Sequence, residues 1–427
     1  MKKAVDQFRL NPLTGLEDRH GRLFVDPESA ALTDLSSVRL LGCRVDTVRQ
    51  LYRGMVRPQV LALFEVSGLV EFAGHQWHAG RVGRDSGYQY KLQNADLGFV
   101  LLLKNFNVKA DVIGAHMKIE VSPHAIQSAS PDVLQEWMDR FAKAALEHVE
   151  PNQCAVHLAL DVQGWTPPKD LMDRLMSRAR NRRDTSGISH VYYDGEAVSY
   201  GRGQSFLFGS ASGIQLAIYN KSLQAYSTDK LDYWQSVWSA MDNPFDAADD
   251  QNYDPDATVW RVELRFHHGI VQQFADGSAD TRTGEILCSR TFAELAPHLD
   301  GLFQYGLQSY RLCSSSGAFD AFWTLMRQDV KVSVPAESLG GHMHYKRHFK
   351  TSKGFSGKNV ELFLGNFVSL LARERAGAGK AFASLQSWVC WPVIKDHYAN
   401  KGMTERDIYK HIQKLLAERT VRWGRAV

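Results

Sequence analysis

Residues 206–223 read FLFGSASGIQLAIYNKSL, with an apolar run on each side of a centre rich in glycine and serine. Two such runs around a glycine turn are typical of a β-hairpin. We therefore expect a pair of antiparallel strands here, joined by a turn at 209–213. The second strand ends at Tyr219, Asn220 and Lys221, and these polar residues are candidates for a functional site.

Further strands and helices are expected on both sides of this hairpin. Short β-branched and apolar runs lie between residues 36 and 125, and CAVHLALDVQGW (154–165) and TVWRVELRF (258–266) are strand-like. Amphipathic helices are expected at 130–149, with Ser130 as N-cap, at 169–183 and near 229–240. This order predicts an α+β fold of mainly antiparallel sheet with packed helices, and it leaves two related halves open.

The chain beyond residue 270 is mostly helical in pattern and basic towards its end. Residues 331–427 contain 17 Lys or Arg and 7 Asp or Glu, a net charge of +10, whereas the whole chain carries +3. We divide the chain into an N-terminal segment (1–35), an α+β core (36–270) and a helical, basic C-terminal region (271–427). The excess charge favours a polyanionic partner, most simply nucleic acid, although a solvated helical surface would also carry it.

Two helices are expected near the end of the chain, separated by Asn400-Lys401-Gly402. Thr404 and Asp407 resemble a capping box at the start of the second helix. This arrangement within residues 384–420 fits a helix-turn-helix that binds DNA, and it fits an ordinary helical hairpin equally well.

The cysteines and the apolar segments indicate a class of protein and a compartment. Cys43, Cys154, Cys288, Cys313 and Cys390 form no CxxC pair, which argues against a zinc site or a disulfide framework. The first residues lack the apolar run of a signal peptide, and no stretch approaches the roughly 18 apolar residues of a membrane span. We expect a soluble cytoplasmic protein with no membrane partner.

Acidic or imidazole side chains occur inside several strand-like segments, where apolar residues are the rule. They are Asp46, Glu120, His157, Asp161 and Glu263. One isolated carboxylate can simply face water, but several on adjacent strands of one sheet could converge. Because Mg²⁺ and Mn²⁺ prefer oxygen ligands and tolerate an imidazole, this set is a candidate metal site.

Five segments resemble, in their order, the motifs of the replication initiation factor family. They are RVDTV (44–48), MKIEVSP (117–123), HLALD (157–161), LFGSASGIQLAIYNKSLQ (207–224) and VWRVELRF (259–266). Members of this family start rolling-circle replication of small plasmids and filamentous phages. The length and the basic C-terminal region look more like a filamentous-phage initiator, of the Pf type, than a plasmid one.

The resemblance implies a DNA-nicking enzyme that acts at a replication origin with Mg²⁺ or Mn²⁺. A tyrosine hydroxyl would attack a phosphodiester, leaving a 5′-phosphotyrosine and a free 3′-OH that primes synthesis. Expected partners are double- and single-stranded origin DNA and a host helicase in the bacterial cytoplasm, and a homodimer is left open. The residues that match the family's site are the metal ligands Asp46, Glu120 and Asp161, the catalytic lysine Lys221, and Arg261 and Glu263 of the W-R-V-E strand. His157 stands where the family has an aspartate, and its imidazole is kept as a candidate metal ligand.

The nucleophilic tyrosine of the family falls on Leu207, and leucine cannot attack phosphate. A tight hairpin at 201–204 would bring Tyr200 opposite this position, which makes Tyr200 the first candidate nucleophile. Tyr219 is the second, and Tyr192 and Tyr193 follow. Alternatives of other classes are an origin-binding protein that does not cut DNA and a conjugative relaxase of a mobile element.

Two groups of basic residues are candidates for DNA binding. They are Arg174, Arg178, Arg182 and Arg183 at the end of the helix expected at 169–183, and Lys346, Arg347 and Lys350 in GGHMHYKRHFK (340–350). A cationic helix end favoured by the helix dipole also explains the first group. His342-Met343-His344 in the second group resembles a motif of another rolling-circle nuclease superfamily, with Tyr398 as its tyrosine, but its basic flanks fit a DNA-contacting loop better. His267 and His268 are expected in an exposed turn.

Overall fold

The computed structural model of the chain divides into two compact units. The structure describes residues 5–10, 21–65, 68–177, 182–185, 205–228, 230–240, 242, 249, 251–279, 286–314, 317–336 and 357–423. The first unit comprises Met1–Ser227 with Gln235–Tyr345, and the second comprises Thr228–Trp234 with Lys346–Val427.

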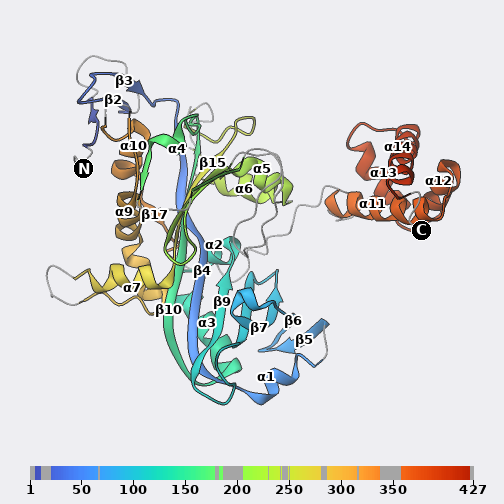
Figure 1. Cartoon of the computed structure of the whole chain (residues 1–427), viewed down its shortest axis with the longest axis horizontal. Helices are drawn as coiled ribbons and strands as arrows, with labels where there is room; N and C mark the ends of the chain where they lie inside the picture. The colour runs from blue at the N-terminus through green and yellow to red at the C-terminus, as the bar shows by residue number, and fades with distance from the viewer. Residues whose placement is uncertain are drawn as a thin grey trace. The chain divides into compact units, whose positions relative to one another are not determined.

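A large, almost entirely antiparallel sheet forms the centre of the first unit. Its order is β12-β13-β14-β15-β10-β4-β9-β8-β7-β6-β5, and β17 (Val332–Ser333) adds a short parallel pairing to β4. The two longest strands, β4 and β10, lie side by side in its middle (Figure 1). The bounds are β4 (Arg39–Val56), β5 (Gly68–Phe72), β6 (His75–Arg81), β7 (Tyr88–Asn94), β8 (Phe99–Asn105), β9 (Gly114–Val121), β10 (Leu146–Gln163), β12 (Arg182–Thr185), β13 (Ser205–Gly209), β14 (Ile214–Asn220) and β15 (Trp260–Phe266).

The alternation of side chains gives the middle of this sheet two different faces. On β10, Val156, Leu158 and Leu160 are fully buried in the main core, and His157 and Asp161 point the other way. Directly paired residues of antiparallel strands share a face, so the register between β14, β15 and β10 extends both faces across the strands. The result is an apolar face and a polar face, and the candidate site residues fall on the polar one.

Helices cover the apolar face. Helix α3 (Pro131–Ala145) begins where the Ser130 side chain accepts a hydrogen bond from the Val133 N–H, and its Asp139 accepts one from the hydroxyl of Tyr52 on β4 at 2.7 Å. Helix α9 (Leu299–Ser309) packs closely, because a β-carbon on Gly306 would meet the Phe266 ring at 2.7 Å. The remaining elements of this unit are β1 (Phe8–Arg9), β2 (Leu23–Val25), β3 (Leu32–Asp34), α1 (Pro58–Ala62), η2 (Arg84–Ser86), α2 (Pro123–Ser128), α4 (Leu171–Arg174), β11 (Leu175–Ser177), α5 (Lys221–Ser227), α7 (His268–Asp276), α8 (Phe292–Leu295), η3 (Ala296–His298), β16 (Tyr310–Leu312) and α10 (Ala321–Asp329), while α6 (Leu231–Ser239) straddles the two units.

The second unit has a separate core made by four helices. They are α11 (Gly357–Arg373), α12 (Ala378–Gln386), α13 (Trp391–Ala399) and α14 (Glu405–Trp423). Leu364, Leu385, Ile394, Ile408 and Ile412 are among its buried side chains. Within the described residues, no helix is long and apolar enough to cross a membrane.

The predicted α+β class, with a helical C-terminal region, is confirmed, as are the hairpin at 206–220 and the helix that starts after Ser130. The helix expected at 169–183 is wrong. Helix α4 ends at Arg174, because Leu175–Ser177 pairs instead with β16, and Arg182–Thr185 pairs with β13. The domain boundary also differs: the compact units divide near residue 346 rather than at 271, and residues 1–35 belong to the first unit.

Candidate functional site

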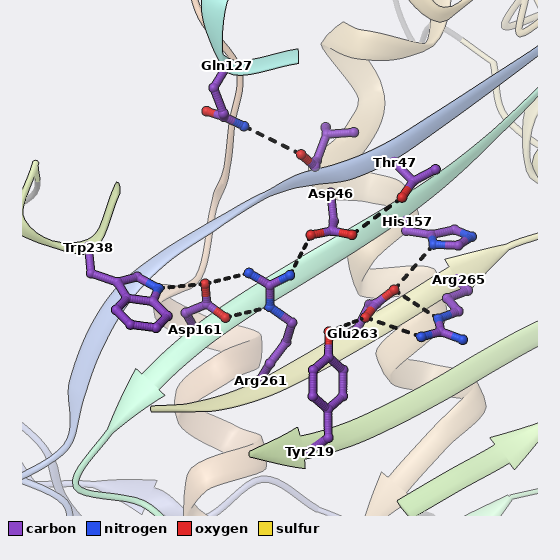
Figure 2. Close-up of polar contacts among 11 residues, drawn as sticks. Asp46, Thr47, Gln127, His157, Asp161, Tyr219, Trp238, Arg261, Glu263 and Arg265 are labelled. Atoms are coloured by element: carbon purple, nitrogen blue, oxygen red, sulfur yellow. Dashed lines mark hydrogen bonds and ion pairs between the residues drawn. The ribbon is translucent and has the colours of Figure 1, made fainter. Parts of the chain in front are cut away.

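The polar face carries a row of ionisable side chains across β14, β15, β10, β4 and β9. The register places Tyr219, Arg261 and Asp161 opposite one another on β14, β15 and β10. Four residues along, Gln215, Arg265 and His157 form a second row, and Glu263 lies between the rows on β15. Figure 2 shows how Tyr219, Arg261, Asp161, Arg265, His157 and Glu263 meet.

Arg261 is the centre of the first group. Its guanidinium donates from Nε to Asp161 Oδ1 at 2.6 Å and from Nη2 to Asp161 Oδ2 at 2.7 Å, and Nη1 donates to Asp46 Oδ1 at 2.5 Å. Trp238 of α6 donates its indole N–H to Asp161 Oδ2 at 2.9 Å. Arg261 and Asp161 are both 1% exposed, so this is a buried, fully engaged ion pair.

A β-bulge explains how Asp46 reaches Arg261. His157 pairs with Thr47 and Leu158 pairs with Val45, which leaves Asp46 as the extra residue of β4 between them. A bulge of this kind turns a side chain away from strict alternation. The bulge therefore allows Asp46 to contact Arg261 on the polar face, which Thr47 shares with its pairing partner His157.

Glu263 is the centre of the second group. His157 Nδ1 lies 3.2 Å from Glu263 Oε1, and Arg265 Nε donates to the same oxygen at 2.8 Å. The Tyr219 hydroxyl donates to Glu263 Oε2 at 2.9 Å. Burial alone would raise the pKa of Glu263, but the adjacent Arg265 and the hydrogen bond with His157 hold it well below its ordinary value.

Glu120 on β9 belongs to a third group. It lies 3.2 Å from Nε of Arg49, its pairing partner on β4, and 3.1 Å from Nζ of Lys118. Burial opposes the charge of Glu120, but Arg49 and Lys118 lower its pKa. In each of the three groups, nearby cations thus keep the carboxylate ionised.

The expected metal ligands do not fit a common cation in this arrangement. Asp46 and Asp161 share Arg261, Glu120 binds Arg49 and Lys118, and His157 binds Glu263. Among the residues that the structure describes, no three His, Cys, Asp or Glu side chains come together in a way that could hold a metal. A metal complex of these residues requires release of the carboxylates from guanidinium, so we derive no chemical step through a metal.

A basic pocket of about 430 Å³ opens beside these groups on the polar face. Arg49, Lys118 and Arg265 line it from three different strands, and no carboxylate is among its lining residues. His157 and Tyr88 contribute to its wall, together with Gln215 and the pair His267-His268 at the start of α7. The pocket has the charge and the hydrogen-bond donors that suit a phosphate.

Sequence reasoning missed most of this pocket. His267 and His268 are half-buried in its wall rather than in an exposed turn, and burial, with His267 and Lys118 nearby, lowers the pKa of His268 to about 4. Arg49, Lys118 and Arg265 each stand two residues from a charged or polar residue of the same strand. Polar residues at every second position could have predicted these pocket residues from the sequence, because side chains two residues apart on a strand share one face.

Neither candidate position in the hairpin supplies a ready nucleophile. Leu207 on β13 lies opposite Ala217, which lies opposite Glu263, so the position that corresponds to the family's tyrosine is on the polar face but holds leucine. Tyr219 is 7% exposed. Burial, and then the neighbouring Glu263, raise the pKa of its phenol well above 10, which disfavours the phenolate.

The hairpin expected at 201–204 lies outside the described residues. Leu207 pairs with Arg183 of β12 on one side and with Ala217 of β14 on the other. Tyr200 itself lies outside the described residues, as do Tyr192 and Tyr193.

The predicted DNA-binding residues have different surroundings. Arg174 donates to Asp320 at 2.5 Å and to the Cys313 carbonyl at 2.8 Å, so its guanidinium joins α4 to the segment before α10. The backbones of Arg182 and Arg183 form β12. Arg178, Lys346, Arg347 and Lys350 lie outside the described residues, with His342-Met343-His344, while Tyr398 is buried in the second unit.

Comparison with known proteins gives one relative over nearly the whole chain. An uncharacterized protein of Pseudomonas phage Pf1, ORF430, is 54% identical over 408 residues, which is 95% of each chain. The chain belongs to the family of this phage protein. The expected Pf-type relation is thereby confirmed, whereas the relative is itself uncharacterized and does not indicate a role in replication. No family model and no solved structure matches the chain.

Removing the charge of Asp161 should destabilise the protein strongly. Asp161→Asn leaves the guanidinium of Arg261 buried without its main partner, which typically costs about 3–5 kcal/mol. Glu120→Gln, at a carboxylate whose side chain is 29% exposed, should cost about 1 kcal/mol or less. Urea unfolding of both variants measures the difference, and equal stabilities would contradict the structural role assigned to the Arg261 pair.

Lys221 should make stability depend on pH. Burial, with Arg261 nearby, lowers its pKa from 10.5 to about 7. Between these values the unfolded chain holds a proton that the folded chain has lost, so the native protein gains stability as pH rises from about 7 to 10.5. Lys221→Met removes this dependence and should stabilise the protein more at pH 6.5 than at pH 10, by on the order of 1–3 kcal/mol. Thermal unfolding at both values tests this, with the exposed Lys143→Met as control.

Proposed function

We propose that this protein initiates rolling-circle replication of a phage genome and binds DNA along the polar face of its central sheet. The observation that carries the proposal is the basic pocket formed by Arg49, Lys118 and Arg265. It opens among the strands that carry the five segments resembling replication initiators. The 54% identity to a Pf1 phage protein supports a phage setting.

The electrostatics of the pocket suit a DNA backbone. Arg49, Lys118 and Arg265 stand beside Glu120 and Glu263, and these carboxylates hold the cations in place before any ligand arrives. A phosphate that enters would accept charge-assisted hydrogen bonds from groups that are already ordered. Binding of this kind is insensitive to sequence and falls steeply with salt.

The proposed chemical step is a transesterification. The oxygen of a tyrosine attacks the phosphorus of the origin strand, the bond to the 3′ oxygen breaks, and that oxygen takes up a proton to become a 3′-OH. Because Tyr219 is buried and Leu207 replaces the expected tyrosine, the hydroxyl is assigned to one of the tyrosines between β12 and β13. Tyr200 is the first choice among Tyr192, Tyr193 and Tyr200.

A second function is favoured by Leu207. A protein with leucine at the position of the family's nucleophile could bind the origin and position other factors without cutting DNA. This alternative shares the basic pocket and differs only in the absence of a covalent intermediate, so one experiment separates the two.

Changing the pocket should weaken DNA binding. Lys118→Met keeps the aliphatic stem beside Tyr88 but removes the charge, and we expect several-fold weaker binding of a single strand and a salt dependence shallower by about 0.7. The control is Lys143→Met, an exposed lysine of α3, the helix over the apolar face. Fluorescence anisotropy at several salt concentrations is the measurement. Equal affinities of the two variants would remove the pocket from the binding surface.

Nicking should depend on a tyrosine between β12 and β13. Purified protein is incubated with supercoiled phage DNA in Mg²⁺, in Mn²⁺ and in EDTA, and mass spectrometry then searches for a tyrosine adduct. We expect an adduct at Tyr200 that Tyr200→Phe abolishes while DNA binding is kept. An adduct at Tyr219 would refute this assignment, and no adduct in any condition would favour the non-cutting function. Full activity in EDTA would refute the expected need for Mg²⁺ or Mn²⁺.

A further inference from the structure

The second unit presents a basic surface on its last helix. Going along α14, the exposed side chains Arg406, Lys410, Gln413, Lys414 and Ala417 recur at intervals of three or four residues. This spacing places them on one face of the helix, which we call the α14 surface. It carries three positive charges and no carboxylate.

The opposite face of α14 is buried in the core of the second unit, and this packing keeps the α14 surface exposed. Ile408, Ile412 and Leu416 are buried in the core of the second unit, where α11 and α12 contribute Leu364 and Leu385. At 100° per residue these buried positions lie across the helix from Arg406 and Lys410. The α14 surface is therefore the side of the helix that the unit's own packing leaves uncovered.

The connection from α13 to α14 is short and well ordered by hydrogen bonds. The N–H groups of Lys401 and Met403 both donate to the carbonyl of Tyr398, and Gly402 adopts a φ of +74°, which favours glycine. Thr404 and Asp407 then form the expected cap, since the Thr404 hydroxyl donates to Asp407 Oδ2 at 2.6 Å. Two helices joined by a tight turn, the second of them longer, have the order of a helix-turn-helix.

The acidic residues of α14 do not oppose the basic face. Glu405 pairs with Lys395 of α13 at 2.5 Å, and Asp407 is engaged in the cap. Glu418 lies at the edge of the surface, 4.0 Å from Lys414. Asp407 also lies close enough to interact with Arg406 and Lys410, so these two cations and one capping carboxylate leave a net positive charge at this end of the surface.

We propose that the α14 surface is a duplex-DNA binding site, in which α14 enters the major groove. Arg406 and Ala417 are about 16 Å apart along the helix, a length that spans about five base pairs. Lys410 and Gln413 are then placed to contact base edges, while Arg406 and Lys414 contact phosphates. Ala417 is small enough for the helix to approach the groove closely.

This proposal rests on the proposed function, because it assumes that the protein acts on DNA. It adds that two different surfaces bind the DNA backbone and recognise the duplex sequence. The basic pocket of the first unit binds backbone without regard to sequence, whereas the α14 surface selects the duplex sequence. An α-helix matches the width of the duplex major groove and has no comparable fit to a single strand. Duplex and single-strand probes can therefore test the two surfaces independently.

The test uses the full-length protein and two matched double variants. Arg406→Ala with Lys410→Ala removes two charges from the α14 surface, and Arg373→Ala with Lys380→Ala removes two exposed charges from α11 and α12. Alanine is favourable in helices, so both proteins should fold, which circular dichroism verifies. Binding is measured on a duplex of about 30 base pairs with a randomised centre and on the matching single strand, followed by sequencing of the selected duplexes.

The wild-type protein should enrich a duplex sequence motif. The α14 variant should lose this motif, bind the selected duplex at least about tenfold more weakly, and show a salt dependence shallower by about 1.8, with single-strand binding unchanged. The α11–α12 variant and Lys118→Met should keep the motif. Equal losses of duplex affinity in both double variants would show that only the net charge matters. Unchanged duplex affinity in the α14 variant would show that its surface binds something other than DNA, such as an acidic protein. Either result overturns the proposal. If Lys118→Met weakens single-strand binding but keeps the duplex motif, both sites are supported. If Lys118→Met leaves single-strand binding unchanged, the pocket of the first unit is refuted as a DNA-binding site, and the result for the α14 surface still stands.

Discussion

The buried guanidinium of Arg261 is the interaction on which the polar face depends. It joins three strands, because it stands on β15 and binds Asp161 of β10 and Asp46 of β4. A charge at 1% exposure is tolerated only when its donors are engaged, so the two aspartates and the register that presents them are coupled to the fold. The same requirement orders Glu263, whose acceptors are shared by Arg265, His157 and Tyr219.

This coupling changes what the acidic strand residues mean. In the sequence they are candidate metal ligands, and in the structure each is the partner of a cation. Three of the cations, Arg49, Lys118 and Arg265, pair with carboxylates and also line the pocket. A phosphate-binding site can therefore be built from cationic side chains that neighbouring carboxylates hold in position.

The sequence predicts those parts of the fold that depend on local patterns. The helix α3 follows from Ser130 and its apolar spacing, β15 follows from its apolar and charged alternation, and the break before α14 follows from Gly402 and the Thr404 cap. The helix expected at 169–183 fails because Leu175 and Arg183 meet strands that are distant in sequence. The bulge at Asp46 and the pairing of Arg183 with Leu207 are equally non-local, so no window of sequence reveals them.

The central strands also impose an order on folding. The meander from β5 to β9 pairs neighbours in sequence, whereas the contact of Arg261 with Asp161 spans 100 residues and that with Asp46 spans 215. Closing such long loops costs entropy before any native contact offsets it, so the local meander has a kinetic advantage. On a ribosome, β4 and β10 are complete long before β15 is made. Until then Asp161 lacks its cation, and the edge of β10 that β15 will cover is open to pairing with another chain.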